Sequence, residues 1–332
     1  MSIAKHAGLL SASLVAAAMT AGAASAQTQL TMISFGGASN LPIWIAQDKG
    51  LFAKEGLDIK LDRTSGSTPQ MEDFMAGKYF IGTSSIDNVV AFHEGQGAKQ
   101  FANYDVIGVG GVHSGLNTVV ARPEIKSYAE IKGKTIAVDS PNSGYAFVLY
   151  KILDNKGLKF GQDYQFVSVG GGPERIAAMK ENKAVAAIVG SPNDIDAKNM
   201  GYTILDDAAA ALGGYQGSAY VVRRDWAKAH EKEVVSWLKA IANAHDYVYA
   251  NKGESIKVLQ SRIKDLSVAD AEIIYGGLTT GAGGLNQKAD INMAGMKAVL
   301  DLRAQFGTPK KTITDPTKYI DMSYHKKAVN GM

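Results

Sequence analysis

Two short loops rich in serine, glycine and asparagine stand where the chain can bind an anion. Residues 35–40 follow the apolar run Leu30–Ser34, and residues 140–145 follow the run Thr135–Asp139. Each loop precedes a segment with helical periodicity, which predicts a helix start with unpaired backbone N–H groups. Such groups, together with the helix dipole, bind anions without a cationic side chain. The expected chemistry is therefore the capture of a small anion.

A second pair of loops repeats this arrangement farther along the chain. Residues 84–88 follow an expected strand at 80–83, and residues 190–194 follow an expected strand at 185–189. Four such loops, facing one another across a hinge, would line a cleft at the carboxyl ends of the strands. The predicted ligand-binding residues are Ser34, Gly36, Trp44, Ser84, Ser85, Asn88, His113, Asn117, Ser140, Asn142, Ser143, Gly144, Tyr145, Gly171, Gly172, Ser191 and Tyr215.

We expect the anionic end of the ligand near the backbone N–H groups of Ser143, Gly144 and Tyr145, with Ser84 and Ser85 opposite. Ser143 has an equally good interpretation as a helix cap, a role that serine often fills. The sequence leaves both open.

Other candidates also have two interpretations. The aromatic rings of Trp44, Tyr145 and Tyr215 either contact the ligand or pack in a core. Arg175 follows the run Gly170–Pro173, from which it can reach the cleft. An ion pair of Arg175 with a neighbouring glutamate, Glu174 or Glu181, is the favoured interpretation.

Patterns typical of catalysis are weak throughout. The chain has no cysteine, and its six histidines are scattered, so no zinc site is expected. Residues 108–113 lack the third glycine of the dinucleotide fingerprint, and Gly133-Lys134-Thr135 lacks the first glycine of a phosphate loop. No G-x-S-x-G nucleophile elbow occurs. We therefore expect a binding protein that is not an enzyme, with no catalytic residue, metal or cofactor.

The loops need elements that position them. Leu41 begins an expected helix that ends at Gly50 or Gly56, and residues 57–61 return as a strand. Between 135 and 190, three expected strands alternate with two expected helices, which predicts a parallel sheet.

Two β-prone runs, 117–122 and 218–224, have the character of hinge strands between two α/β lobes. The chain is long enough for two such lobes, each with its own core. The expected division is residues 27–118 with 222–332 as lobe 1 and residues 119–221 as lobe 2.

The part of the chain after Arg224 is expected to be almost wholly helical. His245 lies one turn after Ile241 on an apolar helix face, which favours a hydrogen-bonded core histidine over a ligand-binding one. Residues 315–332 are expected to form a mobile polar tail.

The first 26 residues have the composition of a secretory signal peptide. Lys5 and His6 precede an uncharged apolar run, and Ala24-Ser25-Ala26 forms an A-x-A cleavage site. The expected mature protein is soluble, periplasmic in a Gram-negative bacterium, and not lipid-anchored because no cysteine is present. The net charge is only +3, so no nucleic-acid partner is expected. We expect a monomer.

Several short motifs resemble the nitrate/sulfonate/taurine-type solute-binding proteins of ABC importers. They are Trp44-Ile-Ala, Lys49-Gly-Leu-Phe52, Glu55-Gly-Leu-Asp58, Gly170-Gly171 with Arg175, and Ser191-Pro192. The resemblance implies a type II periplasmic binding fold, whose first lobe the C-terminal helices complete. It also implies a small anionic or zwitterionic solute, a sulfonate or carboxylate for example. The implied protein partners are a membrane permease and separate ATPase subunits.

The sequence leaves three alternatives open. One is a pyrimidine or other heteroaromatic ligand. A second is an enzyme like the pyrimidine-forming enzymes of thiamine synthesis, which share the fold but rely on a cysteine-rich motif that this chain lacks. The third is an adaptor that reports ligand to a receptor.

Overall fold

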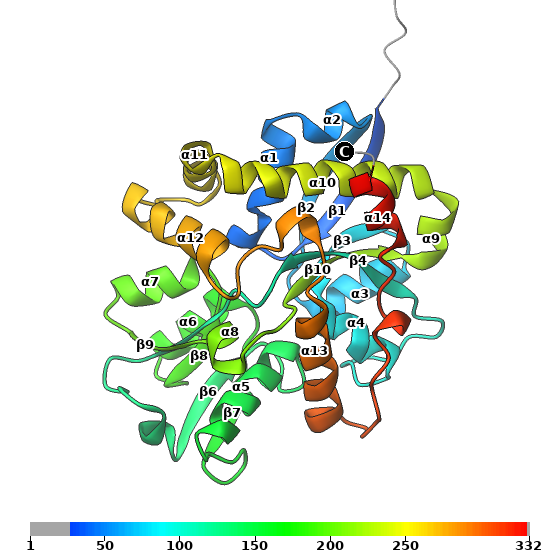
Figure 1. Cartoon of the computed structure of the whole chain (residues 1–332). Coiled ribbons are helices and arrows are strands. Elements are labelled where there is room, and N and C mark those ends of the chain that lie inside the picture. Colours follow the sequence, from blue (N-terminus) through cyan, green and yellow to red (C-terminus); the bar gives the residue numbers. More distant parts are fainter. Residues whose placement is uncertain (1–26, 331–332) are drawn as a thin grey trace, which may run out of the picture.

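The structure, a computed structural model, describes residues 27–330. The expected signal peptide lies outside these residues. Two five-stranded sheets form the centres of two lobes, in the strand orders β2-β1-β3-β10-β4 and β7-β6-β8-β5-β9. Figure 1 shows the first sheet below the long helix α10 and the second sheet among α5, α6, α7 and α8.

The first sheet contains β1 (Thr28–Ser34), β2 (Leu57–Arg63), β3 (Ile81–Ser85), β4 (Val106–His113) and β10 (Ser218–Arg223). Strands β1, β2 and β3 are parallel, whereas β10 is antiparallel to both β3 and β4. The helices between them are α1 (Leu41–Asp48), α2 (Leu51–Lys54), α3 (Ser67–Met75) and α4 (Ile86–His93). Pro42 at the start of α1 favours a helix N-terminus, and Gly50, with a φ of 63°, ends that helix in the left-handed conformation.

The second sheet contains β5 (Thr118–Ala121), β6 (Lys134–Val138), β7 (Tyr164–Ser168), β8 (Ala186–Val189) and β9 (Thr203–Asp207). Its helices are α5 (Gly144–Asn155), α6 (Gly172–Lys180), α7 (Asn193–Asn199) and α8 (Ala208–Leu212). Strands β6, β7 and β8 are parallel, as expected, and β5 is antiparallel to β8 and β9. Both faces of the central strands are apolar, because each face is covered by helices.

The chain passes between the two sheets twice. The first crossover is 114–117, between β4 and β5, and the second lies between β9 and β10. Each expected hinge strand therefore belongs to a single sheet. The second expected boundary, at 221–222, falls inside β10, so the crossover comes earlier than we expected.

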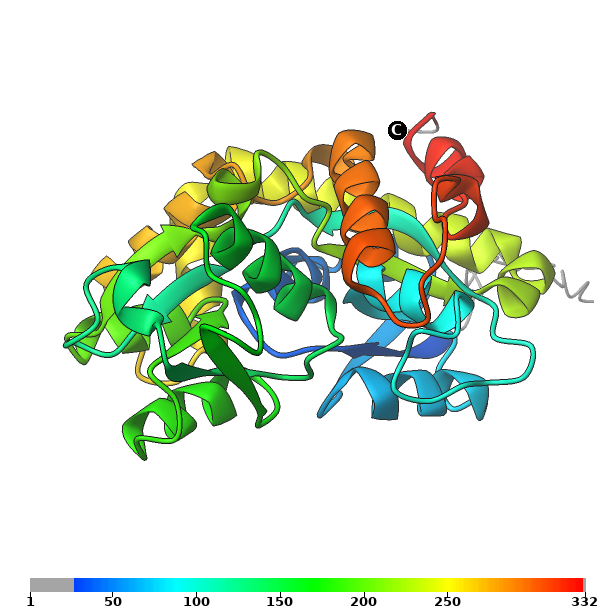
Figure 2. The ribbon, with the colours of Figure 1, turned by 90° about the horizontal axis from the view of Figure 1, so that it is seen from below.

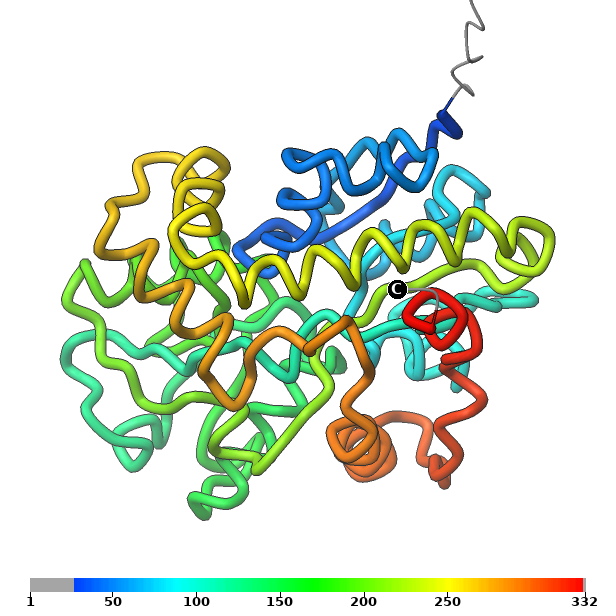
Figure 3. The backbone as a smooth tube through the Cα atoms, turned by 45° about the horizontal axis from the view of Figure 1, so that its top comes forward, coloured from blue at the N-terminus to red at the C-terminus, as the bar shows by residue number. Residues whose placement is uncertain are grey.

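The remaining helices are α9 (Arg224–Ala229), α10 (Glu231–Ala250), α11 (Lys252–Arg262), α12 (Val268–Thr280), α13 (Met293–Phe306) and α14 (Ser323–Asn330). Helix α10 packs on α1 and α14, and in Figure 3 it leads to α11 and α12 beside the second lobe. Helix α13 packs on both α4 and α5, and Figure 2 shows it between the two lobes.

His245 is buried in α10, where its Nε2 lies 2.9 Å from the hydroxyl of Tyr220. This confirms the expected core histidine.

The expectation of a mobile polar tail is wrong for residues 315–330. Residues 315–330 are folded: Ile320 forms a parallel bridge with Gly108 of β4, and Tyr324 and His325 of α14 are buried. Glu94 at the end of α4 accepts hydrogen bonds from Lys311 and from the hydroxyl of Tyr319, at 3.1 and 2.8 Å. The sequence hides this docking because the partners lie more than two hundred residues apart.

Candidate ligand-binding cleft

A cavity of about 1000 Å³ lies between the two lobes. Its first-lobe wall is formed by residues 34–39 after β1 and 63–69 after β2. Its second-lobe wall is formed by 139–140, 143–145, 170–175 and 190–195, which follow β6, β7 and β8. All these segments follow the carboxyl ends of parallel strands, where α/β folds bind ligands. The volume suits a small organic molecule.

The lobes touch at the edge of this cavity. The backbone N–H of Ala38 donates to the carbonyl oxygen of Ser191 across the gap, at 3.0 Å. Asn199 of α7 donates to the carboxylate of Asp270 of α12, at 3.3 Å. The cleft is therefore bounded by direct contacts between the two lobes.

The polar groups of the first-lobe wall differ in how far the protein already satisfies them. The buried hydroxyl of Ser34 bonds to Asn40 and Thr83, at 2.7 and 2.6 Å, which holds the loop after β1 in place. The hydroxyl of Ser85, in contrast, is buried and has no hydrogen-bond partner in the described part of the chain. A buried unpaired hydroxyl is costly, and contact of Ser85 with a polar ligand atom stays a prediction.

The start of α5 forms part of the second-lobe wall. Ser143 is its N-cap, since the hydroxyl accepts from the N–H of Ala146 at 3.2 Å and donates to Asp139 at 2.6 Å. The N–H of Ser143 donates to the carbonyl of Ser140. This N–H is therefore not free to bind an anion, contrary to our expectation. The first-turn N–H groups of Gly144 and Tyr145 have no backbone acceptor among the described residues. The capping interpretation of Ser143 is thus confirmed.

The partners of Arg175 differ from those that the sequence favoured. The expected ion pair with Glu174 or Glu181 is wrong, because no carboxylate of residues 27–330 lies within ion-pair distance of Arg175. Instead Nε donates to the carbonyl of Gly171 at 3.1 Å and Nη1 donates to that of Ile188. Arg175 is only 8% exposed and lines the cavity. Burial lowers its pKa, because the charged guanidinium loses solvation.

His113 adds a neutral group to the same cavity. Its Nδ1 accepts the N–H groups of Gly115 and Leu116, both at 3.1 Å, so the ring proton is on Nε2. Burial lowers its pKa to about 4. At neutral pH His113 is therefore an uncharged donor.

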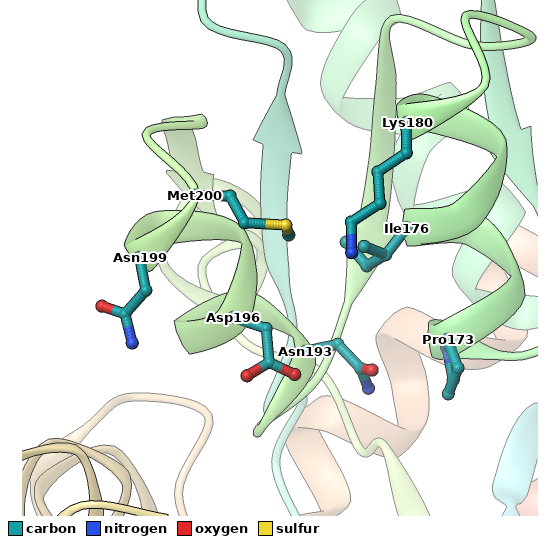
Figure 4. Close-up of a pocket in the computed structure, with 7 residues that line it drawn as sticks. All are labelled: Pro173, Ile176, Lys180, Asn193, Asp196, Asn199 and Met200. Atoms are coloured by element: carbon teal, nitrogen blue, oxygen red, sulfur yellow. The ribbon is translucent and has the colours of Figure 1, made fainter.

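A smaller hollow of about 440 Å³ adjoins the cleft between α6 and α7 (Figure 4). Pro173 and Asn193 line both spaces. Lys180 and Asp196 face this hollow without forming an ion pair. Burial raises the pKa of Asp196.

Comparisons with known proteins agree with this architecture. A model of the NMT1-like family matches residues 23–261, which is most of the chain. The chain belongs to the NMT1-like family. This chain is 23% identical to the putative binding protein YtlA of Bacillus subtilis over 68% of its own length. The match spans 66% of that relative.

Solved structures show the same fold for this NMT1-like protein. The periplasmic nitrate-binding protein NrtA of Synechocystis PCC 6803 aligns with a TM-score of 0.76 at 15% identity, covering 92% of this chain and 89% of that one. The alkanesulfonate-binding protein SsuA of Xanthomonas axonopodis, bound to MOPS, aligns with a TM-score of 0.70 at 17% identity, covering 89% and 98%. The expected type II periplasmic binding fold and family resemblance are confirmed.

The structure brings most of the predicted site residues together around the cavity. Those lining it are Ser34, Gly36, Trp44, Ser85, Asn88, His113, Asn117, Ser140, Ser143, Gly144, Tyr145, Gly171, Gly172 and Ser191. Their contact with a ligand stays a prediction.

Three predicted site residues do not line the cavity. Ser84 is fully buried, because β3 extends through Ser85 and passes directly into α4 without the expected loop. Asn142 points away and donates to the carbonyl of Gln96 at 3.1 Å. Tyr215 is buried with its ring 6.5 Å from that of Tyr145. Tyr215 is thus packed behind a ring that does line the cavity.

The NMT1-like protein has no group of three or more His, Asp or Glu side chains placed to hold a metal ion within residues 27–330. No helix in that range is long and apolar enough to cross a membrane.

Proposed function

We propose that this protein is the substrate-binding component of an ABC importer and captures a small organic anion, sulfonate-like or carboxylate-like, between its lobes. The observation that supports this most is Arg175. Its guanidinium is buried, lines the cavity and has no carboxylate partner among residues 27–330. A buried cation without a counter-ion is costly, and an anionic ligand removes that cost.

Closure of the lobes explains how such a ligand is retained. The ligand binds one lobe first, and contacts from the other lobe then favour the closed form in proportion to the extra affinity they supply. The proposed partners are a membrane permease, which recognises the closed form, and separate ATPase subunits. The protein acts in the periplasm after removal of residues 1–26 and catalyses no reaction.

A thermal-shift panel tests this proposal. Purified protein is heated with alkanesulfonates, alkanoates, nitrate, bicarbonate and pyrimidines, each at high concentration. A ligand present at a hundred times its Kd stabilises the protein by about 2.7 kcal/mol, so the melting temperature should rise with one of the organic acids. A rise with pyrimidines alone would favour a heteroaromatic ligand instead. No rise with any compound would contradict the proposal.

A further inference from the structure

The two crossovers between the lobes meet at one side chain, that of Gln216. It lies in the second crossover, just before β10, and is fully buried. Its Nε2 donates to the carbonyl oxygens of His113 and Ser218, at 3.1 and 2.8 Å. His113 is the last residue of β4, where the first crossover begins. A single amide group therefore joins the ends of both crossovers.

The same amide also holds a third segment, the loop before α13. Its Nε2 donates to Oδ1 of Asn286 at 3.2 Å, and its Oε1 accepts the backbone N–H of Asn292 at 2.8 Å. Asn286 in turn donates to the hydroxyl of Ser114 in the first crossover, at 3.1 Å. Because α13 packs on both α4 and α5, the bonds of Gln216 extend to a helix that touches both lobes.

The backbones of these three segments are in close contact around Gln216. A Cβ on Gly283 would stand 2.8 Å from the backbone of Gly115, and a Cβ on Gly295 would stand 2.5 Å from the backbone nitrogen of Gln216. Approaches this short leave no room for a side chain. The two crossovers and the loop before α13 therefore form one packed unit with Gln216 at its centre.

The chain has torsional freedom next to this unit. Gly115 of the first crossover has a φ of 111°, and Gly214 of the second has a φ of 131°. Both values fall in the region that favours glycine, and a Cβ on Gly214 would meet nothing within 4 Å. Changes of backbone dihedral angles at a few such residues are sufficient to rotate one lobe against the other.

We infer that Gln216 is the fixed point about which the lobes turn, and thus a positioning residue for the cleft. Its amide keeps the crossovers and the loop before α13 together while Gly115 and Gly214 change conformation. His113 and Ser218 also line the cavity, so the same bonds hold two wall residues in place. The use of this fixed point in ligand capture rests on the proposed function, whereas the fixed point itself is tested in ligand-free protein.

Distance measurements between spin labels on the two lobes test this inference. The chain has no cysteine, so Asp58→Cys in the first lobe and Lys134→Cys in the second, both exposed, give a labelled parent protein. Gln216→Met keeps a long side chain but removes the four hydrogen bonds. Without ligand, its distribution of interlobe distances should be broader than that of the parent. The amide proton of Asn292 should exchange about tenfold faster.

Gln70→Met is the matched control. Gln70 is also fully buried, but it lies in α3 and donates to the carbonyl of Thr83 within the first lobe, at 2.8 Å. Its replacement should lower the stability while the distribution of interlobe distances stays that of the parent. The same distribution in Gln216→Met, Gln70→Met and the parent would overturn the inference, because Gln216 would then support the fold without guiding the lobes.

Gly214→Ala keeps the inference testable if Gln216→Met does not fold. Alanine rarely adopts a φ of 131°, so the second crossover must change conformation and the mean interlobe distance should shift. The exchange of the Asn292 amide should stay that of the parent, because the unit around Gln216 is intact. Gly201→Ala is the control, since Gly201 has a φ of 80° and open space around it but lies in a turn within the second lobe. An unchanged distance, or a shift with faster exchange of Asn292, would overturn the inference.

The outcomes separate this inference from the proposed function. If the parent binds no acid of the thermal-shift panel while Gln216→Met broadens the distribution, the proposed function fails and the fixed point holds. If the parent binds an acid while Gln216→Met changes neither the distribution nor the exchange of Asn292, the inference fails and the proposed function holds.

Discussion

The backbone N–H of Ala38 donates to the carbonyl oxygen of Ser191 at 3.0 Å, and the two residues belong to opposite lobes. Ala38 begins the 3-10 turn that leads into α1, and Ser191 lies in the loop between β8 and α7. Gly37 lies so close to this contact that a Cβ there would stand 3.1 Å from the same oxygen. The lobes therefore meet through backbone atoms at the cavity edge.

Ala38→Pro should weaken ligand binding, because it removes this contact between the lobes. Proline tolerates the first position of a helical turn. Its nitrogen, however, carries a ring carbon in place of the hydrogen that donates to the carbonyl oxygen of Ser191. We expect an affinity loss of about tenfold or more, since the bond is lost and the ring opposes closure. Small-angle scattering should show reduced compaction with ligand. Ala38→Gly keeps the donor and should close normally; equal compaction of both variants would refute this role.

Protein stability should fall as the pH falls from 6.5 towards 5. Burial lowers the pKa of His113 to about 4 and that of His245 to about 3. The unfolded chain binds protons on both histidines near pH 6.5, whereas the folded protein does not, so acid favours unfolding. Each histidine contributes a slope of up to about 1.4 kcal/mol per pH unit.

Urea unfolding at several pH values between 6.5 and 5 measures this slope. His113→Asn keeps an acceptor for the N–H groups of Gly115 and Leu116. It should lower the slope of stability against pH by up to about 1.4 kcal/mol per pH unit, which is the contribution of one proton. The exposed His230 provides the control, and His230→Asn should show the same slope as the wild type. An unchanged slope in His113→Asn would show that His113 is not held neutral.

Glu94→Gln should loosen the C-terminal segment. Burial opposes ionisation of Glu94, but hydrogen bonds from Lys318, Tyr319 and Lys311 outweigh it and lower its pKa to about 2. The ionised form therefore stabilises the fold above pH 4.5, and this contribution is lost as the pH falls towards 2. At pH 7 we expect a loss of about 2 kcal/mol.

Hydrogen exchange locates the effect of Glu94→Gln. Amide protons of residues 307–330 should exchange faster than in the wild type. The matched control is Glu231→Gln, which removes a surface ion pair with Lys327 and should change stability by less than about 1 kcal/mol. Equal exchange rates in the two variants would argue against Glu94 as the anchor.

Loss of both partners of the buried ion pair of Asp87 with Arg303 should cost less stability than the two single losses added together. Nε of Arg303 donates to Asp87 at 2.9 Å, and Nη2 donates to the carbonyl of Asn142 at 3.0 Å, so α13 is tied to both lobes. Asp87→Leu or Arg303→Met alone leaves a buried charge and should cost about 3–5 kcal/mol. Chemical unfolding of the double variant should show a smaller loss than the sum of the single variants. An additive loss would contradict this account.

The local parts of the fold could be predicted from the sequence, because local patterns determine them. Pro42 and Gly50 indicate the two ends of α1, and Ser143 indicates the start of α5. The loops after β1 and β6 could be assigned to a cleft because they follow predicted parallel strands.

The remainder depends on contacts between distant residues. Nothing near Arg175 in the chain shows that its guanidinium turns to the carbonyl of Ile188 instead of to a glutamate. Ser84 is equally hidden, because its burial follows from the pairing of β3 with β10. The run of glycines before Arg175 allows the backbone to approach the cleft closely. It is the local signal that places Arg175 near the cleft.

The central claim is that Arg175 holds the acid group of a ligand, and titration calorimetry of Arg175→Gln tests it most directly. The titrant is the organic acid that stabilises the wild type most, and Lys180→Gln, on the exposed side of the same helix, is the control. We predict a loss of affinity of about tenfold to a hundredfold for Arg175→Gln, with wild-type affinity in the control. An Arg175→Gln variant that binds the acid as tightly as the wild type would contradict the claim.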